Sequence, residues 1–168
     1  MKFALMLTAV AFFSIPGFAQ EKKASPPAKA EGTINGVSVT INYHSPGVKG
    51  RTIFGDLEPW GKVWRAGANN ATTVEFSQDV KINGKALAKG KYAFFILPKE
   101  NEDWVIIFNT VPDQWGAYKY DESKDALRVN VSPKESEMTE RLEYVVDEST
   151  GMVALNWAEV SVPFTVSM

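Results

Sequence analysis

The chain has 168 residues, no Cys and a formal net charge of −2 at pH 7, with 18 Lys and Arg against 20 Asp and Glu. Without Cys it cannot form disulfides, so its core must supply the stability that small exported proteins often take from cross-links. It contains no basic block, and phosphate backbones are bound by clustered positive charge, so we expect no nucleic-acid partner.

The first 19 residues have the pattern of a secretory signal peptide. A short basic start precedes the uncharged apolar run 3–15, and Gly17 and Ala19 place small residues where a signal peptidase requires them. The alternative is a membrane anchor, but a span needs about 20 apolar residues and Pro16 ends this run earlier. We therefore predict cleavage after Ala19, a periplasmic or extracellular location, and no membrane span after signal removal.

The following segment, residues 20–31, is rich in Lys, Ala, Pro and Glu and has no periodic apolar pattern. This composition is typical of a flexible leader. We place the folded part at residues 32–168, a length that suits one domain with a substantial core.

Alternation of apolar and polar residues predicts β-strands along most of this domain. Strands with one polar face are expected at 37–44, 127–132 and 160–167, and shorter strands at 72–77, 141–146 and 152–157. Residues 92–97 and 104–108 are apolar on both faces, which favours two central strands joined as a hairpin. Asn35-Gly36 and Asn83-Gly84 are typical of tight hairpin turns, because both residue types accept a positive φ.

About nine or ten short strands predict an all-β fold, a single antiparallel β-sandwich with the jelly roll among its arrangements. Residues 136–142 are the one weak helix candidate. Pro163 predicts an edge position for its strand, because proline cannot donate to a strand ladder.

Metal and acid–base chemistry have few candidate residues. One His and no Cys cannot form a zinc site of the usual kind, and we expect no metal and no cofactor. The acidic run 121–125 lacks the spacing and Gly of an EF-hand loop and is interpreted as a solvated turn. His44 lies on the polar side of a predicted strand, where it is either a general base or an ordinary surface His.

The most informative segment is residues 49–73, which gathers two of the five Trp and two of the four Arg among Gly residues. Arg is planar and has five donors, so its use here, in a chain that mostly carries Lys, indicates a fixed geometry. Arg51 and Arg65 can receive a carboxylate or another anion, with Asn69 orienting it. The alternative is that Arg65 pairs with Asp121 or Asp125 and anchors a long loop.

The other Trp residues divide by context. Trp104 and Trp157 share strand phases with apolar residues and are predicted core residues. Trp60 and Trp115 each precede Gly in a loop, where one ring face is unobstructed. Such a ring can stack on a sugar, or it can cover an open end of the sandwich.

These residues also resemble a known family, the exported domain of unknown function numbered 2911. The resemblance covers nearly the whole mature domain, and its motifs follow in order as Lys49-Gly50-Arg51, Pro59-Trp60-Gly61, Trp64-Arg65-Ala66-Gly67-Ala68-Asn69, Gly90-Lys91-Tyr92, Gln114-Trp115-Gly116 and Tyr120-Asp121. Many members carry Glu after Gly-Ala-Asn where this chain has Asn70, so a role that needs a carboxylate there has no support. The family has no established activity, so the resemblance implies export and a compact β-rich fold and assigns no catalytic residue.

Taken together, these features favour a non-enzymatic binding module. Its ligand would be a small molecule, a glycan or an envelope protein, held on the surface built by residues 49–69 and 114–125. The alternative is a hydrolase, acting on glycans with a carboxylate pair supported by Arg65 or His44; its catalytic residues are unassigned. The candidate ligand-binding residues are Arg51, Trp60, Trp64, Arg65, Asn69, Trp115, Asp121 and Asp125.

Overall fold

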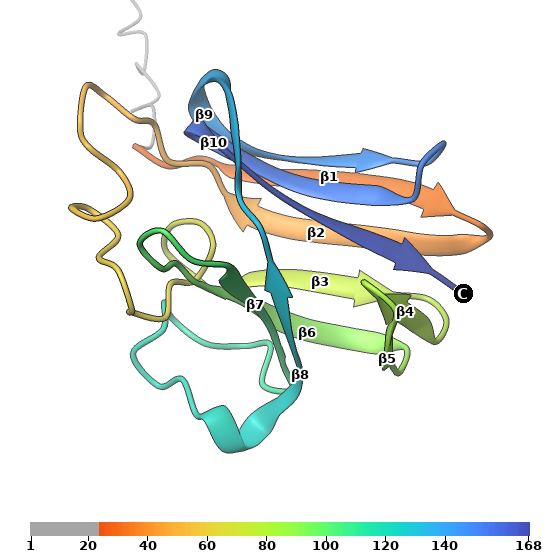
Figure 1. Ribbon diagram of the computed structural model, residues 1–168. Helices are drawn as coiled ribbons and strands as arrows, with labels where there is room; N and C mark the ends of the chain where they lie inside the picture. The colour runs from red at the N-terminus through yellow and green to blue at the C-terminus, as the bar shows by residue number, and fades with distance from the viewer. Residues whose placement is uncertain (1–23) are drawn as a thin grey trace, which may run out of the picture.

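The computed structural model describes residues 24–168 (Figure 1), so the predicted signal peptide and its cleavage site lie outside the described residues. Within this range the elements are β1 (Pro27–Ile34), β2 (Val37–His44), β3 (Thr72–Phe76), β4 (Val80–Ile82), β5 (Lys85–Leu87), β6 (Gly90–Leu97), β7 (Trp104–Asn109), the short 3-10 helix η1 (Glu122–Lys124), β8 (Asp125–Val131), β9 (Lys134–Asp147) and β10 (Met152–Ser167). The described chain is therefore almost entirely β-structure.

The strands form two antiparallel sheets that do not close into a barrel. Their orders are β1-β2-β3-β6-β7-β8 and β5-β4-β10-β9. Consecutive strands of the six-stranded sheet are neighbours, except that the β4–β5 hairpin leaves it to join the four-stranded sheet. The predicted antiparallel sandwich is confirmed, and so is the β6–β7 hairpin, in which Phe94 lies opposite Phe108.

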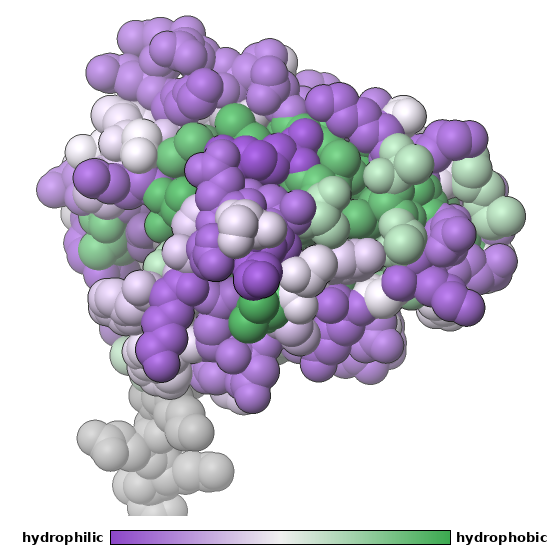
Figure 2. All heavy atoms as spheres, turned by 90° about the horizontal axis from the view of Figure 1, so that it is seen from below, coloured by the Kyte–Doolittle hydropathy of each residue, from purple (hydrophilic) through white to green (hydrophobic). Residues whose placement is uncertain are grey.

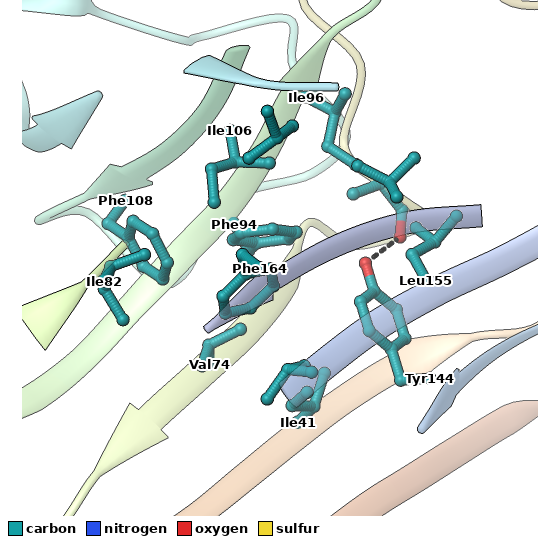
Figure 3. Packing of buried hydrophobic residues seen from close by; sticks show 14 of the residues in the cluster. Ile41, Val74, Ile82, Phe94, Ile96, Ile106, Phe108, Tyr144, Leu155 and Phe164 are labelled. Atoms are coloured by element: carbon teal, nitrogen blue, oxygen red, sulfur yellow. Dashed lines mark hydrogen bonds between the residues drawn. The ribbon is translucent and has the colours of Figure 1, made fainter. Parts of the chain in front are cut away.

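The main core lies between the two sheets. Figure 3 shows side chains of the six-stranded sheet, such as Ile41 and Phe94, packed against Leu155 and Phe164 of the four-stranded sheet. Each large apolar side chain buried in this way contributes about 1.5–3 kcal/mol. The hydroxyl of Tyr144, on β9, crosses this core and donates a hydrogen bond of 2.8 Å to the carbonyl oxygen of Ala66.

The two Asn-Gly turns have the expected backbone. Asn35 and Gly36 have φ of 49° and 84°, and Asn83 and Gly84 have φ of 45° and 81°. A positive φ at both central residues is the geometry that matches the twist of a two-residue hairpin. These turns connect β1 to β2 and β4 to β5.

The flexible-leader prediction is wrong for residues 27–31, because β1 begins at Pro27. This strand pairs with β2 along its whole length, from Pro27 opposite His44 to Ile34 opposite Val37. Ala28 and Ala30 pack against the main core, but their side chains are too small to give a visible apolar period. The backbone ladder to β2 therefore holds a segment whose composition suggests disorder.

Two other predictions about the last strands are wrong. Residues 136–142, the weak helix candidate, lie within β9. Pro163 lies on β10, an inner strand of its sheet rather than an edge strand. Pro163 is tolerated there because β10 pairs with β9 as far as Ser161 and with β4 only from Val166, so the proline falls between the two ladders.

Two long loops, residues 45–71 and 110–121, lie at the same end of the sandwich (Figure 1). They are joined by backbone hydrogen bonds, from Ala71 N to Gln114 O and from Gly116 N to Asn69 O, each 3.0 Å long. The second loop also covers the outer face of β6 and β7, where Phe95 and Ile107 are fully buried in a small second core. This cover explains why these two strands are apolar on both faces. None of the helical structure in the described part of the chain is long and apolar enough to cross a membrane.

Candidate ligand-binding site

The first loop is fixed by an aromatic cluster inside the main core. Trp64 is 3% exposed, its ring stacks on Trp157 with centroids 5.6 Å apart, and its Nε1 donates to the carbonyl oxygen of Gly67 at 3.1 Å. Phe54 packs against Trp64 in a T-shaped arrangement, with ring centroids 5.8 Å apart. The sequence analysis named Trp64 as a ligand-binding candidate, and the structure places its ring in the space between the two sheets.

Trp60 covers the end of this cluster. Its half-buried ring lies roughly parallel to Phe54, with centroids 6.5 Å apart, and meets Trp104 edge-on at 6.0 Å. Gly55 has a φ of 92°, and a Cβ there would lie 2.6 Å from Trp60 Nε1, so only glycine lets the ring pack this closely. These contacts support the interpretation of Trp60 as a cover over an open end of the sandwich.

Asp125 is part of a buried polar network at the end of the second loop. Its side chain is only 4% exposed. Its Oδ1 accepts from Asn109 Nδ2 at 2.8 Å, and its Oδ2 accepts from the hydroxyl of Tyr120 at 2.5 Å and from Arg128 NH1 at 2.9 Å. Burial and the bond to this carboxylate raise the pKa of the Tyr120 hydroxyl. Asp125, which the sequence analysis named as a ligand-binding candidate, is therefore a structural anchor in this fold.

The predicted pairing of Arg65 with Asp121 or Asp125 is also wrong. Asp125 pairs with Arg128, and the exposed carboxylate of Asp121 accepts from Ser123 N at 2.9 Å as the cap of η1. An ion pair between an Asp and an Arg does anchor the loop, but the Arg is Arg128 on β8, three residues after Asp125.

The two Arg residues of the first loop have different surroundings. Arg51 donates from Nε to Val48 O at 3.0 Å and from NH2 to Gly47 O at 2.6 Å, so it fastens the start of its own loop. Arg65 is half-buried beneath the second loop, where a Cβ on Gly116 would lie 3.4 Å from its NH1. Within residues 24–168 its Nε is buried without a hydrogen-bond partner.

Glu58 is the carboxylate that the sequence analysis missed. Burial raises the pKa of its side chain to about 7, although the charges of Arg65 and Arg51 act to lower it. The sequence offered one signal for Glu58, namely its position between Arg51 and Arg65 in the same segment. The carboxyl group of Glu58 therefore titrates near neutral pH.

This raised pKa makes stability depend on pH. The folded protein keeps a proton on Glu58 that the unfolded chain releases above the ordinary value of 4.5, so the stabilisation is complete below 4.5 and is lost as the pH rises through about 7. In the parent, the free energy of unfolding falls between pH 5 and pH 8 as Glu58 loses its proton. We expect this fall to be smaller in Glu58→Gln by about 1–2 kcal/mol, allowing for the partial exposure of the side chain. Urea unfolding at pH 5 and pH 8 measures the free energy of unfolding of each protein, and Glu143→Gln, at an exposed position, is the control. Equal pH dependence in Glu58→Gln and the parent would contradict the raised pKa.

The second loop presents two exposed aromatic rings. The side chain of Trp115 is 60% exposed and that of Tyr118 is 83% exposed. They line a hollow of about 400 Å³, here called the aromatic hollow, whose lining residues are Asn70, Asp113, Gln114, Trp115, Tyr118 and Lys119. Figure 2 views the molecule from the side on which this loop lies in Figure 1, and hydrophobic residues (green) other than Trp and Tyr show there between hydrophilic ones (purple).

The backbone beneath these rings is ordered by the first loop. Asn69 has a φ of 59°, its carbonyl accepts from Gly116, and its Nδ2 donates to Ser25 O at 3.4 Å. Asn70 forms an antiparallel bridge with Trp115. The structure thus brings Asn69 close to Trp115, with the backbone of Asn69 bonded to the second loop, while Trp60 and Trp64 belong to the aromatic cluster.

Two further hollows lie on the surface. One of about 450 Å³, here called the sheet hollow, is lined by Pro27, Ala28, Asn42, Tyr43, His44, Asn70, Ala71, Thr73, Lys91, Pro112 and Asp113. The other, of about 640 Å³, lies between residues 99–104 and 132–135, and its aromatic residues Trp60 and Trp104 pack against each other in the cluster beneath. Across residues 24–168, no three His, Asp or Glu side chains are grouped so as to hold a metal ion.

The fold and this surface define an antiparallel β-sandwich with two joined loops that present exposed aromatic rings at one end. A family model described as "Protein of unknown function (DUF2911)" matches residues 25–166, and the chain belongs to this family. Comparison with curated proteins and with solved structures gave no match. The resemblance seen in the sequence is therefore confirmed, and the match includes β1.

Proposed function

We propose that the protein is a binding module and that its ligand is a glycan seated on Trp115 and Tyr118. The observation that carries this proposal is the exposure of two large rings, 60% and 83%, on a loop that backbone hydrogen bonds hold in place. Exposed apolar surface of this kind marks interaction sites on soluble proteins. Export to the periplasm or the exterior, predicted from the first 19 residues, would bring the module to such ligands.

The chemistry around the rings suits a sugar. A sugar ring has an apolar C–H face that packs on an aromatic ring and a rim of hydroxyls that need hydrogen bonds. Asn70, Asp113 and Lys119 line the same hollow and supply an amide, a carboxylate and an ammonium for those hydroxyls. Because the loop backbone is already fixed, binding loses less conformational entropy than it would on a mobile loop.

Replacing Trp115 by Ala tests the proposal. We expect glycan affinity to fall by about tenfold or more, as it does when a central aromatic anchor is removed. Stability should change by no more than about 0.5 kcal/mol, because the ring is mostly in solvent. Titration calorimetry against a glycan panel measures the first effect and thermal unfolding the second.

The control for this variant is Met138→Ala, which truncates a 57% exposed apolar side chain on β9, outside the aromatic hollow. Glycan affinity that is unchanged in Trp115→Ala would refute the seat on this loop. A panel without any binding glycan would refute the class of ligand.

A hydrolase is the second candidate, and Glu58 is the observation in its favour. A carboxylic acid with a pKa of about 7 can donate a proton to a leaving group at neutral pH. Cleavage of aryl glycosides by the parent but not by Glu58→Gln would support this candidate over a simple binding module. Equal cleavage by the parent and by Glu58→Gln would show that Glu58 is not the acid of such a hydrolase.

A further inference from the structure

The aromatic hollow and the sheet hollow are neighbours. Asn70 and Asp113 line both of them. Both residues are exposed, and Asn70 is fixed by its bridge to Trp115. A ligand in the aromatic hollow can therefore extend over this shared wall into the sheet hollow.

The sheet hollow has a different chemistry. Its floor is the outer face of the six-stranded sheet, where Asn42 on β2 lies opposite Thr73 on β3 and Lys91 extends from β6. His44 follows at the end of β2. Amide, hydroxyl, ammonium and imidazole groups bind hydroxyls or carboxylates by hydrogen bonds, whereas the aromatic hollow adds two stacking rings.

Each hollow is large enough for one small ligand, since ligand sites in proteins span roughly 300–1,000 Å³. Their volumes are about 400 and 450 Å³. Two adjacent sites of unequal chemistry suit a ligand made of linked units, in which the second unit binds at high effective concentration once the first is in place.

We propose that the ligand is a linear oligosaccharide that spans both hollows. One sugar stacks on Trp115 and Tyr118, and the next crosses the wall of Asn70 and Asp113 to meet Asn42, Thr73 and Lys91. This inference rests on the proposed glycan function and adds to it the length of the ligand and a second set of contacts.

A length series tests it on the purified exported protein. The probes are N-acetylglucosamine oligomers and glucose oligomers (cello-oligosaccharides) of one to five units, titrated by calorimetry into the parent, Asn42→Ala and Trp115→Ala. Asn130→Ala, an exposed Asn on β8 outside both hollows, is the control.

In the series that binds, we expect parent affinity to rise by about tenfold or more from the monosaccharide to the longer oligomers. Asn42→Ala should lose about five- to tenfold in affinity for the long oligomers and nothing for the monosaccharide, because one hydrogen bond to the second sugar is removed. Trp115→Ala should lower the affinity for oligomers of every length, and Asn130→Ala should leave the affinity unchanged at every length.

Affinity independent of length, or a length dependence that survives in Asn42→Ala, would overturn the two-hollow ligand and leave the glycan module standing. Absence of binding at every length in both series would overturn the proposed function and this inference together.

Discussion

Replacing Asp125 by Ala should lower the free energy of unfolding by about 3–4 kcal/mol. The change leaves three donors, on Asn109, Tyr120 and Arg128, without the acceptor that they share. Removing one partner of a buried charged pair typically costs about 3–5 kcal/mol, and the 31% exposure of the Arg128 side chain places the expectation in the lower part of that range. In a domain of this size, that loss lowers the melting temperature by about 6–15 °C.

Asp121→Ala is the matched control, since it removes the exposed carboxylate of the same loop and only one cap of η1. It should cost much less stability than Asp125→Ala, because only one exposed capping bond is lost. Denaturant unfolding of the two variants separates these values. If Asp125→Ala were no less stable than Asp121→Ala, the buried network would not anchor the loop.

Trp64→Ala should be equally damaging for a different reason. The indole is 3% exposed and stacks on Trp157, so its loss removes apolar burial and leaves a cavity between the sheets. Replacing a buried Trp or Phe by Ala costs about 3–5 kcal/mol. Thermal and denaturant unfolding measure the loss.

The comparison with Trp115→Ala makes the test specific, because the same truncation is made on a mostly exposed ring. Trp115→Ala should stay within about 0.5 kcal/mol of the parent. A small effect of Trp64→Ala would show that this ring does not lie in the core and would restore it as a ligand-binding candidate.

The sandwich was predictable because its inner faces alternate strictly. In β2, for example, Val37, Val39 and Ile41 are buried and Ser38 and Asn42 are exposed. β1 was missed because strand pairing needs only backbone groups, and its Ala side chains carry little hydrophobic signal. The single long β10 was read as two strands because a bulge at Ala158, with a φ of 54°, interrupts the alternation.

The candidate site was predictable in position but not in roles. The sequence identified the two loops and left Trp115 as either a stacking ring or a cover, and the structure shows it to be exposed. It could not decide which side of a loop Trp64 faces, because a loop has no fixed period. Nor could it reveal that Asp125 turns toward Arg128, since that depends on where η1 ends and β8 begins.

The second loop serves the fold and the surface with different residues. Ala117 and Tyr120 pack on the second core, and Gly116 leaves room for Arg65, so these positions cannot change freely without uncovering β6 and β7. Trp115, Tyr118 and Lys119 point outward and carry little of the stability. If the proposed glycan site is correct, substitutions at these three outward positions change the ligand preference while the layer beneath them stays closed.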